Sequence, residues 1–312
     1  MRLDVIIPTY NRSEMLKRTL DSLLAAPVPE GLSVRVTVAD NNSKDDTRQV
    51  SADYIKRFGD RFNYLFEGRQ GRSCAINAGI AATDGDLVGM IDDDEEVDVN
   101  WYARIYSAFA DQEVDFIGGA CKPRWGGTPP PWLPKEYPAV IGWIDGGDQV
   151  RVYGEEYDGV LMGGNAVIKR SVLQKVGYYS TALGRQGKRL LSVEDEDMTE
   201  RLLAAGARGL YLPDLVIYHY IPPERLTKSY HRRWCFWRAV SLGVRDRDRR
   251  APVAYLLGVP RYFYGSAARA MLRKAQAILS RGKDPAQRFS DELRLWDLAG
   301  FFYGKHFYKP AR

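Results

Sequence analysis

The sequence predicts an α/β protein: a mostly parallel central sheet with helices on both faces, followed by a helical and basic C-terminal extension. Three observations carry this prediction. Short apolar strands alternate with amphipathic helices along most of the 312 residues, and the connections between them are a few residues long. Polar or acidic turns follow several of these strands. Residues 225–312 contain 20 Lys and Arg against 6 Asp and Glu, whereas residues 1–224 contain 25 against 34, and this asymmetry indicates two parts with different tasks.

The individual elements follow from local patterns, taken in chain order. Leu3–Ile7 has the pattern of a buried strand that Pro8 ends, and Ser13 is a residue type that caps the start of a helix. The Pro-, Gly- and Trp-rich stretch over 122–135 is expected to be a long loop. We expect strands over 3–7, 34–39, 62–66, 87–91 and 209–219, a glycine turn that enters a strand over 163–168, and helices that begin near 13, 46, 71, 170 and 192.

The acidic run Asp92–Glu96 directly follows the apolar strand over 87–91. Neighbouring carboxylates repel one another, and a low-dielectric environment penalises each of them, so several at one strand end are usually held by a cation. Oxygen ligands of this kind suit Mg²⁺ or Mn²⁺. Ligands of parallel sheets bind outside the carboxyl ends of the strands, so 8–10, 40–41 and 92–94 should converge at one edge. Taken alone, the run is equally well explained as a solvated acidic loop.

A second acidic cluster, Glu194–Asp197, stands where a helix should begin, and the strand over 209–219 ends at His219. Carboxylates in a first helical turn are favoured by the helix dipole, which by itself explains such a cluster. The functional alternative is a general base at the mouth of a site. A lone histidine is more often structural than a ligand, but the chain has only three, and this one follows the second acidic cluster.

Composition and motifs exclude several classes of protein. Hydrophobic residues make up 45% of the chain, which is enough for a core and too many for a disordered protein. There is no secretory signal at the start and no apolar run of the roughly 18–20 residues that a membrane-spanning helix needs. Three scattered cysteines argue against a disulfide framework and a zinc site, so a reducing cytoplasm is expected. The absence of GxGxxG and GxxxxGK[ST] motifs speaks against a dinucleotide dehydrogenase and a phosphate-loop NTPase.

These pieces, in this order, resemble glycosyltransferase family 2, the inverting family with the GT-A (nucleotide-diphospho-sugar transferase) fold. DVIIPTYNR resembles the family's first strand and turn, VADNNSKDD stands where the family has an Asp-Asp-Gly-Ser type turn, and GRSCAINAGIAATDGDLVGMIDDDEE resembles the helix that leads to its DxD metal site. GGNAVIKRSVLQKVGYYSTALG is similar to the acceptor-side segment, LLSVEDEDMTERLLAAG to the helix that holds the base, and YLPDLVIYHYIP to the strand that ends in a histidine. The resemblance covers about residues 3–220. It implies a catalytic domain over 1–224, with a nucleotide-sugar half over 1–98 and an acceptor half over 99–224, before the extension 225–312.

The resemblance also implies a reaction and the residues that carry it out. A sugar would move from a nucleotide-diphosphate donor, most often a UDP-sugar, to a hydroxyl of a glycan or lipid-linked acceptor in surface polysaccharide or glycolipid assembly. Mn²⁺ or Mg²⁺ would neutralise the leaving diphosphate and would be held by Asp92, Asp94 and His219. The proton of the acceptor hydroxyl would go to Asp195, oriented by Glu194, with Glu196 and Asp197 as further candidate bases. The donor would be contacted by Pro8, Thr9, Tyr10, Asp40, Arg72 and Asp93.

The sequence departs from the family pattern at three places. Ile76 precedes Asn77 where many members have arginine, so Arg72, one turn earlier, is expected to supply that charge to the donor phosphates. Asn41-Asn42 replaces the more usual Asp-Gly, which leaves the identity of the nucleotide open. His231–Trp234 stands in place of the Gln-x-x-Arg-Trp motif of polymerising synthases, so we expect single addition rather than processive synthesis.

The C-terminal extension mixes arginine with aromatic residues, and 252–281 has a largely helical pattern that Pro260 should start or kink. The apolar residues that can share one side of this helix are Leu257, Tyr264, Ala268, Met271, Ala275 and Ile278. A basic amphipathic helix with aromatic residues can lie in a membrane interface, and the alternative is a helix that packs this stripe on the catalytic domain. We expect a cytoplasmic protein with a peripheral contact to an anionic membrane surface. No nucleic-acid partner is expected, because no binding motif accompanies the charge.

Two other functions share some of these features. A metal-dependent nucleotidyltransferase would use the same carboxylate, metal and diphosphate chemistry, but it would not need a second carboxylate on the acceptor side. A non-catalytic peripheral membrane-binding protein would not need Asp92, Asp94 and Asp195 together. The complete acidic set therefore favours glycosyl transfer.

Overall fold

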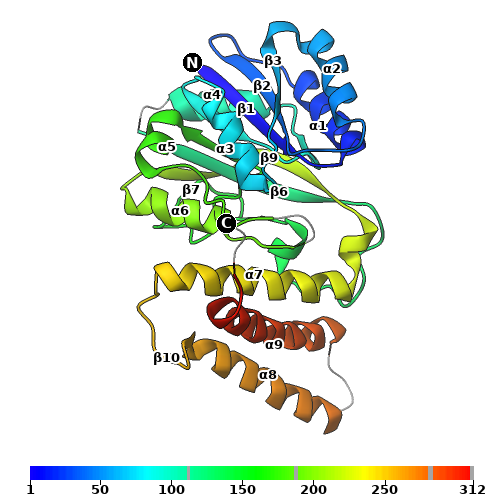
Figure 1. Ribbon diagram of the computed structural model, residues 1–312, viewed down its shortest axis with the longest axis vertical. Coiled ribbons are helices and arrows are strands. Elements are labelled where there is room, and N and C mark those ends of the chain that lie inside the picture. Colours follow the sequence, from blue (N-terminus) through cyan, green and yellow to red (C-terminus); the bar gives the residue numbers. More distant parts are fainter. Residues whose placement is uncertain (111–112, 186–188, 280–283, 310–312) are drawn as a thin grey trace. The chain divides into compact units, whose positions relative to one another are not determined.

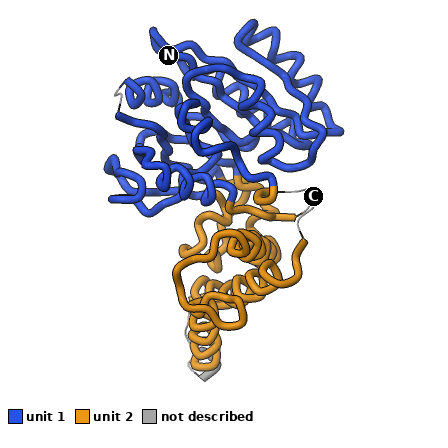
Figure 2. The backbone as a smooth tube through the Cα atoms, turned by 60° about the vertical axis from the view of Figure 1, so that its left-hand side comes forward, with its two compact units in different colours: residues 1–124, 143–181, 194–220 blue, residues 125–142, 182–193, 221–312 orange. Residues whose placement is uncertain are grey.

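The computed structural model describes residues 1–110, 113–185, 189–279 and 284–309. The chain divides into two compact units (Figure 2). Unit 1 comprises residues 1–124, 143–181 and 194–220, and unit 2 comprises residues 125–142, 182–193 and 221–312. Unit 2 thus includes two segments that precede the C-terminal extension. The domain boundaries expected from the sequence stay a prediction.

Unit 1 is built on a sheet in which nine strands are described, in the order β3-β2-β1-β4-β8-β6-β9-β5, with β7 paired to β9 (Figure 1). Its first half is parallel: β1 (Arg2–Thr9) lies between β2 (Ser33–Asp40) and β4 (Leu87–Met90), and β3 (Phe62–Phe66) forms the edge. The other strands are β5 (Glu95–Val97), β6 (Phe116–Trp125), β7 (Arg151–Val152), β8 (Ala166–Lys169) and β9 (Gly209–Ile221). Of these, β8 pairs antiparallel with β4 and β6, and β9 with β5 and β7. The predicted α/β class is confirmed, and the antiparallel half is a feature that strand–helix alternation did not predict.

Helices cover both faces of this sheet. As a result, the side chains of β1 are buried on both sides from Leu3 onward. The helices of unit 1 are α1 (Ser13–Ala25), α2 (Thr47–Phe58), α3 (Arg72–Ala81), α4 (Trp101–Ala110), α5 (Arg170–Val176) and α6 (Glu194–Ala204). Val5 and Ile7 of β1 belong to one core cluster with residues of α1, α2 and α4, whereas Ile6 belongs to a second cluster with residues of α3, α5 and α6. The alternation of side chains along a strand thus divides the core into two layers.

β1 is longer than the sequence predicts, because it continues through Pro8 to Thr9. The Ile6 carbonyl accepts a hydrogen bond from Ile91 N at 3.2 Å, so Ile6 and, two residues on, Pro8 face the β4 side of the ladder. The register with β4 ends at Ile6. Pro8 therefore lies beyond the last residue pair between β1 and β4, where the ladder needs no backbone N–H donor from β1. The prediction that Pro8 ends the strand is wrong, and Thr9 lies in register with Asp40.

The start of α1 also differs from the prediction. The N-cap position is Arg12, without a side-chain cap, and the backbone N–H of Ser13 donates to Asp45 Oδ2 at 2.9 Å. The other oxygen of Asp45 accepts from Thr47 N at 3.2 Å and from Thr47 Oγ1 at 2.6 Å. One carboxylate in a connecting turn thus serves the first turns of both α1 and α2, and Ser13 is not the cap.

Unit 2 contains α7 (Lys228–Asp248), α8 (Arg261–Leu279) and α9 (Pro285–His306) (Figure 1). A hairpin of β10 (Tyr255–Leu256) and β11 (Val259–Pro260) joins α7 to α8. α7 and α9 approach closely through glycine: a Cβ at Gly300 or Gly304 would collide with the backbone carbonyl oxygens of Phe236 and Val240. Among the helices in the described part of the chain, none is long and apolar enough to cross a membrane.

The predicted helix over 252–281 corresponds to α8, and its start directly after Pro260 agrees with the expectation that this proline starts or kinks the helix. α8 begins only at Arg261, because residues 255–260 form the hairpin. The buried residues of α8 are Phe263, Ala267 and Ala270, whereas Ala268, Met271 and Ala275 of the predicted stripe are exposed. The side chain of Ile278 lies outside the described part.

Candidate active site

The carboxyl ends of β1, β2 and β4 meet at one edge of the sheet. Thr9 ends β1 in register with Asp40 at the end of β2, and its carbonyl accepts a hydrogen bond from Asn41 N at 2.8 Å. The Thr9 hydroxyl donates to Asp93 Oδ2 at 2.8 Å, just beyond the end of β4. The three polar segments 8–10, 40–41 and 92–94 therefore lie together at this edge, as parallel strands require.

Arg12 binds two carboxylates of the acidic run. Its NH1 lies 2.9 Å from Asp93 Oδ1 and 2.9 Å from Asp94 Oδ2, and both aspartates are buried. These two carboxylates hold the pKa of Arg12 well above its ordinary value. Burial raises the pKa of Asp93, and Arg12 opposes that rise. Sequence reasoning missed Arg12, although its place three residues after the end of β1 was a signal.

Arg72 joins the acidic run to the second acidic cluster. Its Nε and NH2 both lie 2.8 Å from Asp92 Oδ1, and its NH1 lies 3.4 Å from Glu194 Oε1 and 3.5 Å from Asp195 Oδ1. Burial acts to lower the pKa of Arg72, but the three carboxylates hold it well above its ordinary value. The two acidic features thus face each other across one guanidinium.

Asp195 lies in the first turn of α6, and its side chain is 24% exposed. Burial raises the pKa of its carboxyl, with Arg72 acting in the opposite direction. A Cβ at Gly163 would collide with Asp195 Oδ1, and one at Gly164 would collide with the Glu95 carboxylate. The glycine turn therefore passes directly over two carboxylates. An accessible carboxylate with a raised pKa has the properties of a general base.

The other carboxylates of the second acidic cluster have different surroundings. Glu194 is buried against Arg72, and Glu196 is half-buried. Asp197 Oδ2 accepts from Arg201 Nε at 2.9 Å, and the same guanidinium donates to the Val176 carbonyl at 2.8 Å. Asp197 therefore takes part in joining α6 to the end of α5.

The pairing of β5 with β9 places His219 beside the acidic run. Glu95 is in register with His219, and His219 Nε2 lies 3.5 Å from Asp94 Oδ2. Glu95, which sequence reasoning did not single out, is buried and accepts from Asp92 N at 2.8 Å. Burial, reinforced by Asp92 and Asp94, raises the pKa of Glu95 well above its ordinary value.

The structure brings two of the three predicted metal ligands together, since Asp94 lies beside His219 while Asp92 is turned toward Arg72. Within the described ranges, no group of three or more His, Cys, Asp or Glu side chains is gathered closely enough to hold a metal ion. Metal binding by all three ligands would therefore require Asp92 to turn away from Arg72, and it would place the ion close to Arg12, whose NH1 lies 2.9 Å from Asp94 Oδ2.

Asp40 is buried at the end of β2. Its Oδ1 accepts from Ser43 N at 2.9 Å, and its Oδ2 accepts from the Tyr64 hydroxyl at 2.7 Å. Burial and the hydrogen bond to Asp40 raise the pKa of Tyr64 to about 12, so the hydroxyl remains a donor. A nucleotide base would have to share one of these carboxylate oxygens, and the contact of Asp40 with the base stays a prediction.

The remaining residues predicted to shape the nucleotide pocket divide by exposure. Pro8 and Thr9 are buried in β1, whereas Tyr10 is 42% exposed at the same edge. The Asn41 side chain accepts from Gly71 N at 2.7 Å and so connects this edge to the start of α3, which sequence reasoning missed.

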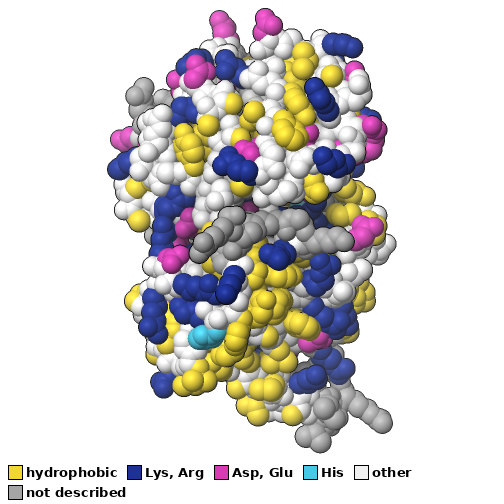
Figure 3. All heavy atoms as spheres, in the orientation of Figure 1, with side chains coloured by type: hydrophobic (Ala, Val, Ile, Leu, Met, Phe, Trp, Pro, Cys, Tyr) yellow, Lys and Arg dark blue, Asp and Glu magenta, His cyan; other side chains and the backbone are white. Residues whose placement is uncertain are grey.

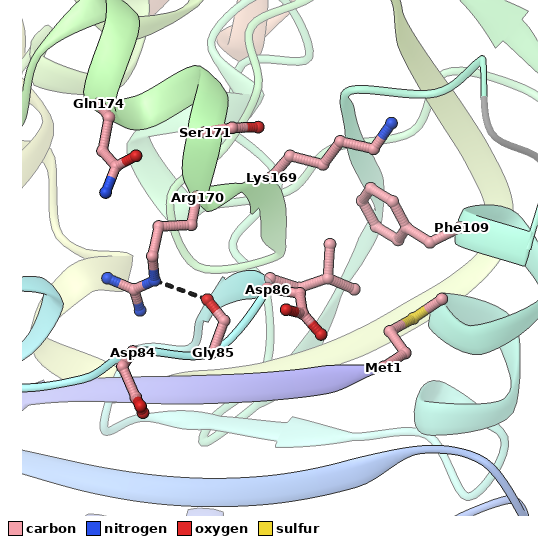
Figure 4. A pocket seen from close by; sticks show the side chains of 10 residues that line it. Met1, Asp84, Gly85, Asp86, Phe109, Lys169, Arg170, Ser171 and Gln174 are labelled. Carbon is pink, nitrogen blue, oxygen red and sulfur yellow. Dashed lines mark hydrogen bonds between the residues drawn. The ribbon is translucent and has the colours of Figure 1, made fainter.

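A cavity of about 590 Å³ lies at the opposite edge of the sheet, at the amino ends of β1 and β4 (Figure 4). Met1, Asp86 and Lys169 contribute to its lining, and Arg170 Nε donates to the Gly85 carbonyl at 2.6 Å. Its lining contains none of the site residues predicted from the sequence, so this cavity is separate from the acidic edge.

Comparisons with known proteins agree with this architecture. The profile of Glycosyl transferase family 2 matches residues 4–177. Glucosyl-dolichyl phosphate glucuronosyltransferase of Haloferax volcanii is 27% identical over 252 residues, which is 79% of this chain and 78% of that protein. Succinoglycan biosynthesis protein ExoM of Rhizobium meliloti is 26% identical over 232 residues, which is 74% of this chain and 70% of that protein. Among solved structures, mannosyltransferase PcManGT of Pyrobaculum calidifontis in complex with GDP-Man and Mn²⁺ has a TM-score of 0.63 at 20% identity and covers 97% of this chain and 86% of its own.

The fold is therefore the GT-A fold of nucleotide-sugar transferases, with its acidic edge at the carboxyl ends of the parallel strands. The chain belongs to glycosyl transferase family 2, and the protein is a glycosyltransferase.

Proposed function

We propose that this enzyme moves a sugar from a nucleotide-diphosphate donor, a UDP-sugar, to a hydroxyl of a glycan or lipid-linked acceptor in surface polysaccharide or glycolipid assembly. Transfer inverts the anomeric carbon and uses Mn²⁺ or Mg²⁺. The observation that carries the proposal is the Arg72 bridge, which holds Asp92 and Asp195 on two sides of one guanidinium. The relatives support the acceptor class, since one is named for transfer to a glucosyl-dolichyl phosphate and another for succinoglycan biosynthesis.

The side chains of Asp92, Asp94 and His219 are of the chemical types that bind a divalent ion. Two carboxylates and an imidazole are ligands that Mn²⁺ accepts, and Asp94 and His219 already lie 3.5 Å apart. These two residues would hold the ion, joined by Asp92 after its release from Arg72. When bound, the ion would supply Lewis-acid stabilisation of the leaving diphosphate. The solved structure that contains GDP-Man and Mn²⁺ supports both the donor class and the ion.

Asp195 would accept the proton of the acceptor hydroxyl as its oxygen forms a bond to the anomeric carbon. The bond from that carbon to the diphosphate breaks on the opposite face, and the nucleoside diphosphate leaves with the bonding electrons. Glu194 would orient Asp195, and Arg72 would turn from Asp92 to the donor phosphates. At the other end of the donor, Tyr10 and Asp40 would contact the nucleotide base.

A turnover assay on purified protein tests this assignment. A thermal-shift screen of UDP and GDP with Mn²⁺ first identifies the nucleotide, and release of that nucleotide from its sugar conjugates is then measured with and without Mn²⁺. Asp195→Asn should lower kcat by about 10²–10⁴, and Asp92→Ala should weaken the dependence on Mn²⁺. Glu200→Gln, an exposed change on the same helix, should leave turnover unchanged. Wild-type turnover in both Asp92→Ala and Asp195→Asn would overturn the assignment.

A further inference from the structure

The hairpin between α7 and α8 presents two leucines to solvent. Leu256 pairs with Val259, so the loop of the hairpin consists of Leu257 and Gly258 alone. The exposed fractions are 48% for Leu256 and 71% for Leu257. Single exposed apolar residues are normal on protein surfaces, but two successive leucines at the tip of a turn form a projecting apolar feature.

The backbone of this turn disfavours leucine as well. Leu257 has a φ of +49° and Gly258 a φ of +74°. Two-residue hairpin loops with positive φ at both positions favour Asn-Gly or Asp-Gly, because Asn and Asp tolerate the left-handed region better than other side chains. Leucine is therefore disfavoured at position 257 in two respects. The left-handed backbone conformation suits other residue types, and the apolar side chain is exposed to solvent. Strain of this kind in an exposed turn points to a use for the side chain.

The tip is continuous with aromatic side chains at the end of α9. His306 Nε2 lies 2.9 Å from the Leu257 carbonyl oxygen, and the His306 ring lies 4.7 Å from the Phe302 ring. The Phe307 ring lies 5.9 Å from Phe302 and 6.4 Å from Tyr303, and Phe307 is 62% exposed. We refer to these exposed residues as the apolar tip surface: Leu256, Leu257, Phe302, Tyr303 and Phe307. In Figure 3, hydrophobic side chains gather over the region where Figure 1 places α8 and α9, with Lys and Arg around them.

The exposed charge beside this surface is mostly positive, since Asp248 is the one exposed acidic residue in 245–262 and the nearby Asp246 is buried and paired with Lys305. Residues 249–262 contain three arginines and no acidic residue. Arg249, Arg250 and Arg261 are exposed, and the Arg250 guanidinium lies 4.0 Å from the centre of the Tyr255 ring, beside the hairpin. Apolar and aromatic side chains surrounded by cationic ones match an anionic lipid surface. The apolar and aromatic side chains enter the membrane interface, and the cationic side chains contact the lipid phosphates. A second copy of the chain fits less well, because a symmetric contact would place arginines near arginines.

We propose that the apolar tip surface docks this protein on an anionic lipid bilayer, with Leu256, Leu257 and Phe307 entering the interface and the three arginines contacting lipid phosphates. Docking requires neither the donor nor the acceptor. It is measured without them, so its failure would leave the proposed transfer reaction untouched. If the acceptor is lipid-linked, docking concentrates the enzyme at the surface where that acceptor lies.

Vesicle sedimentation with the full chain tests the proposal. The wild type should sediment with vesicles of equal parts phosphatidylcholine and phosphatidylglycerol and stay in the supernatant with phosphatidylcholine alone. Leu257→Asn removes one inserted side chain and should weaken binding to the anionic vesicles about tenfold. Arg249→Gln, Arg250→Gln and Arg261→Gln should each weaken it about fivefold.

The variant Leu257→Asn separates docking from a structural role. Because Asn suits the left-handed conformation, its Tm should be equal to or higher than that of the wild type while vesicle binding falls. Ile55→Ser, at a position 43% exposed on α2 of unit 1, should not change vesicle binding. A fall of both Tm and vesicle binding in Leu257→Asn would overturn the proposal, as would unchanged vesicle binding in that variant. Dissociation of a wild-type dimer by Leu257→Asn, with vesicle binding intact, would instead assign the surface to a contact between copies.

Discussion

Replacing Arg72 with methionine removes the cation that lies among Asp92, Glu194 and Asp195 while keeping most of the apolar stem. The Arg72 side chain is 13% exposed, and the three carboxylate side chains are 30%, 7% and 24% exposed. Removing one partner of a fully buried ion pair costs about 3–5 kcal/mol, whereas a fully exposed pair contributes about 0.2–1 kcal/mol. Only the contact with Asp92 is as short as 2.8 Å, and that carboxylate is the most solvated of the three. We therefore expect the free energy of unfolding to fall by about 2–3 kcal/mol.

The same geometry predicts energetic coupling between Arg72 and Asp195. In the wild type, Asp195→Asn removes a carboxylate that Arg72 attracts. In the Arg72→Met protein, the same change removes one of three carboxylates that repel one another. The destabilisation caused by Asp195→Asn should therefore be smaller by about 1–2 kcal/mol in the Arg72→Met background.

Urea unfolding of the four proteins at neutral pH, followed by circular dichroism, measures both quantities. Arg48→Met on the exposed side of α2 is the matched control and should change the free energy of unfolding by less than about 0.5 kcal/mol. A loss of less than about 0.5 kcal/mol for Arg72→Met, or strictly additive effects in the double variant, would refute the inference that this guanidinium neutralises a shared acidic cluster.

Three further predictions concern a glycine over the site, a glycine between two helices and a buried carboxyl. Gly163→Ala should lower kcat by at least about tenfold, with the fold retained, because its Cβ collides with Asp195 Oδ1 and displaces the proposed base. Gly304→Ala should destabilise unit 2 by about 1–3 kcal/mol in thermal unfolding, because the collision is with a backbone oxygen of α7 that cannot rotate away. Burial raises the pKa of Asp297 to about 6 from 3.8, against the lowering effect of Arg238. Since the folded state then holds the proton more tightly, stability falls as pH rises between these values. Asp297→Asn should be neutral below about pH 4 and stabilising by about 3 kcal/mol above about pH 7.

Each of these has a control or an outcome that contradicts it. Wild-type kcat in Gly163→Ala would show that the glycine turn does not position Asp195. Gly265→Ala on α8, where a Cβ would meet only the mobile end of Arg269, should stabilise by about 0.5–1 kcal/mol. Equal stability of Gly304→Ala and Gly265→Ala would contradict the close packing of α7 and α9. A stability difference between Asp297→Asn and wild type that does not vary with pH would contradict the raised pKa.

Much of unit 1 could be predicted from the sequence, because its features depend on local patterns. Buried apolar runs alternate with amphipathic helices in the first ninety residues, and this alternation determines a parallel sheet. The carboxyl ends of parallel strands share one edge, so Thr9, Asp40 and Asp92 had to lie near one another wherever the helices packed. The Glu194–Asp197 cluster was likewise correctly placed in the first turn of a helix. Local chemistry and strand direction therefore determined the fold class and the place of the acidic edge.

The tertiary structure alone decided which charges meet and which faces are buried. Arg12 reaches Asp94 from a different strand-helix unit, and only the antiparallel pairing of β5 with β9 brings His219 beside the same carboxylate. On α8, packing within unit 2 buried Phe263, Ala267 and Ala270, whereas Met271 of the stripe expected from the sequence is exposed. Local periodicity shows which faces a segment has. The choice among those faces depends on packing and electrostatic energies summed over segments far apart in the chain, which no local pattern contains.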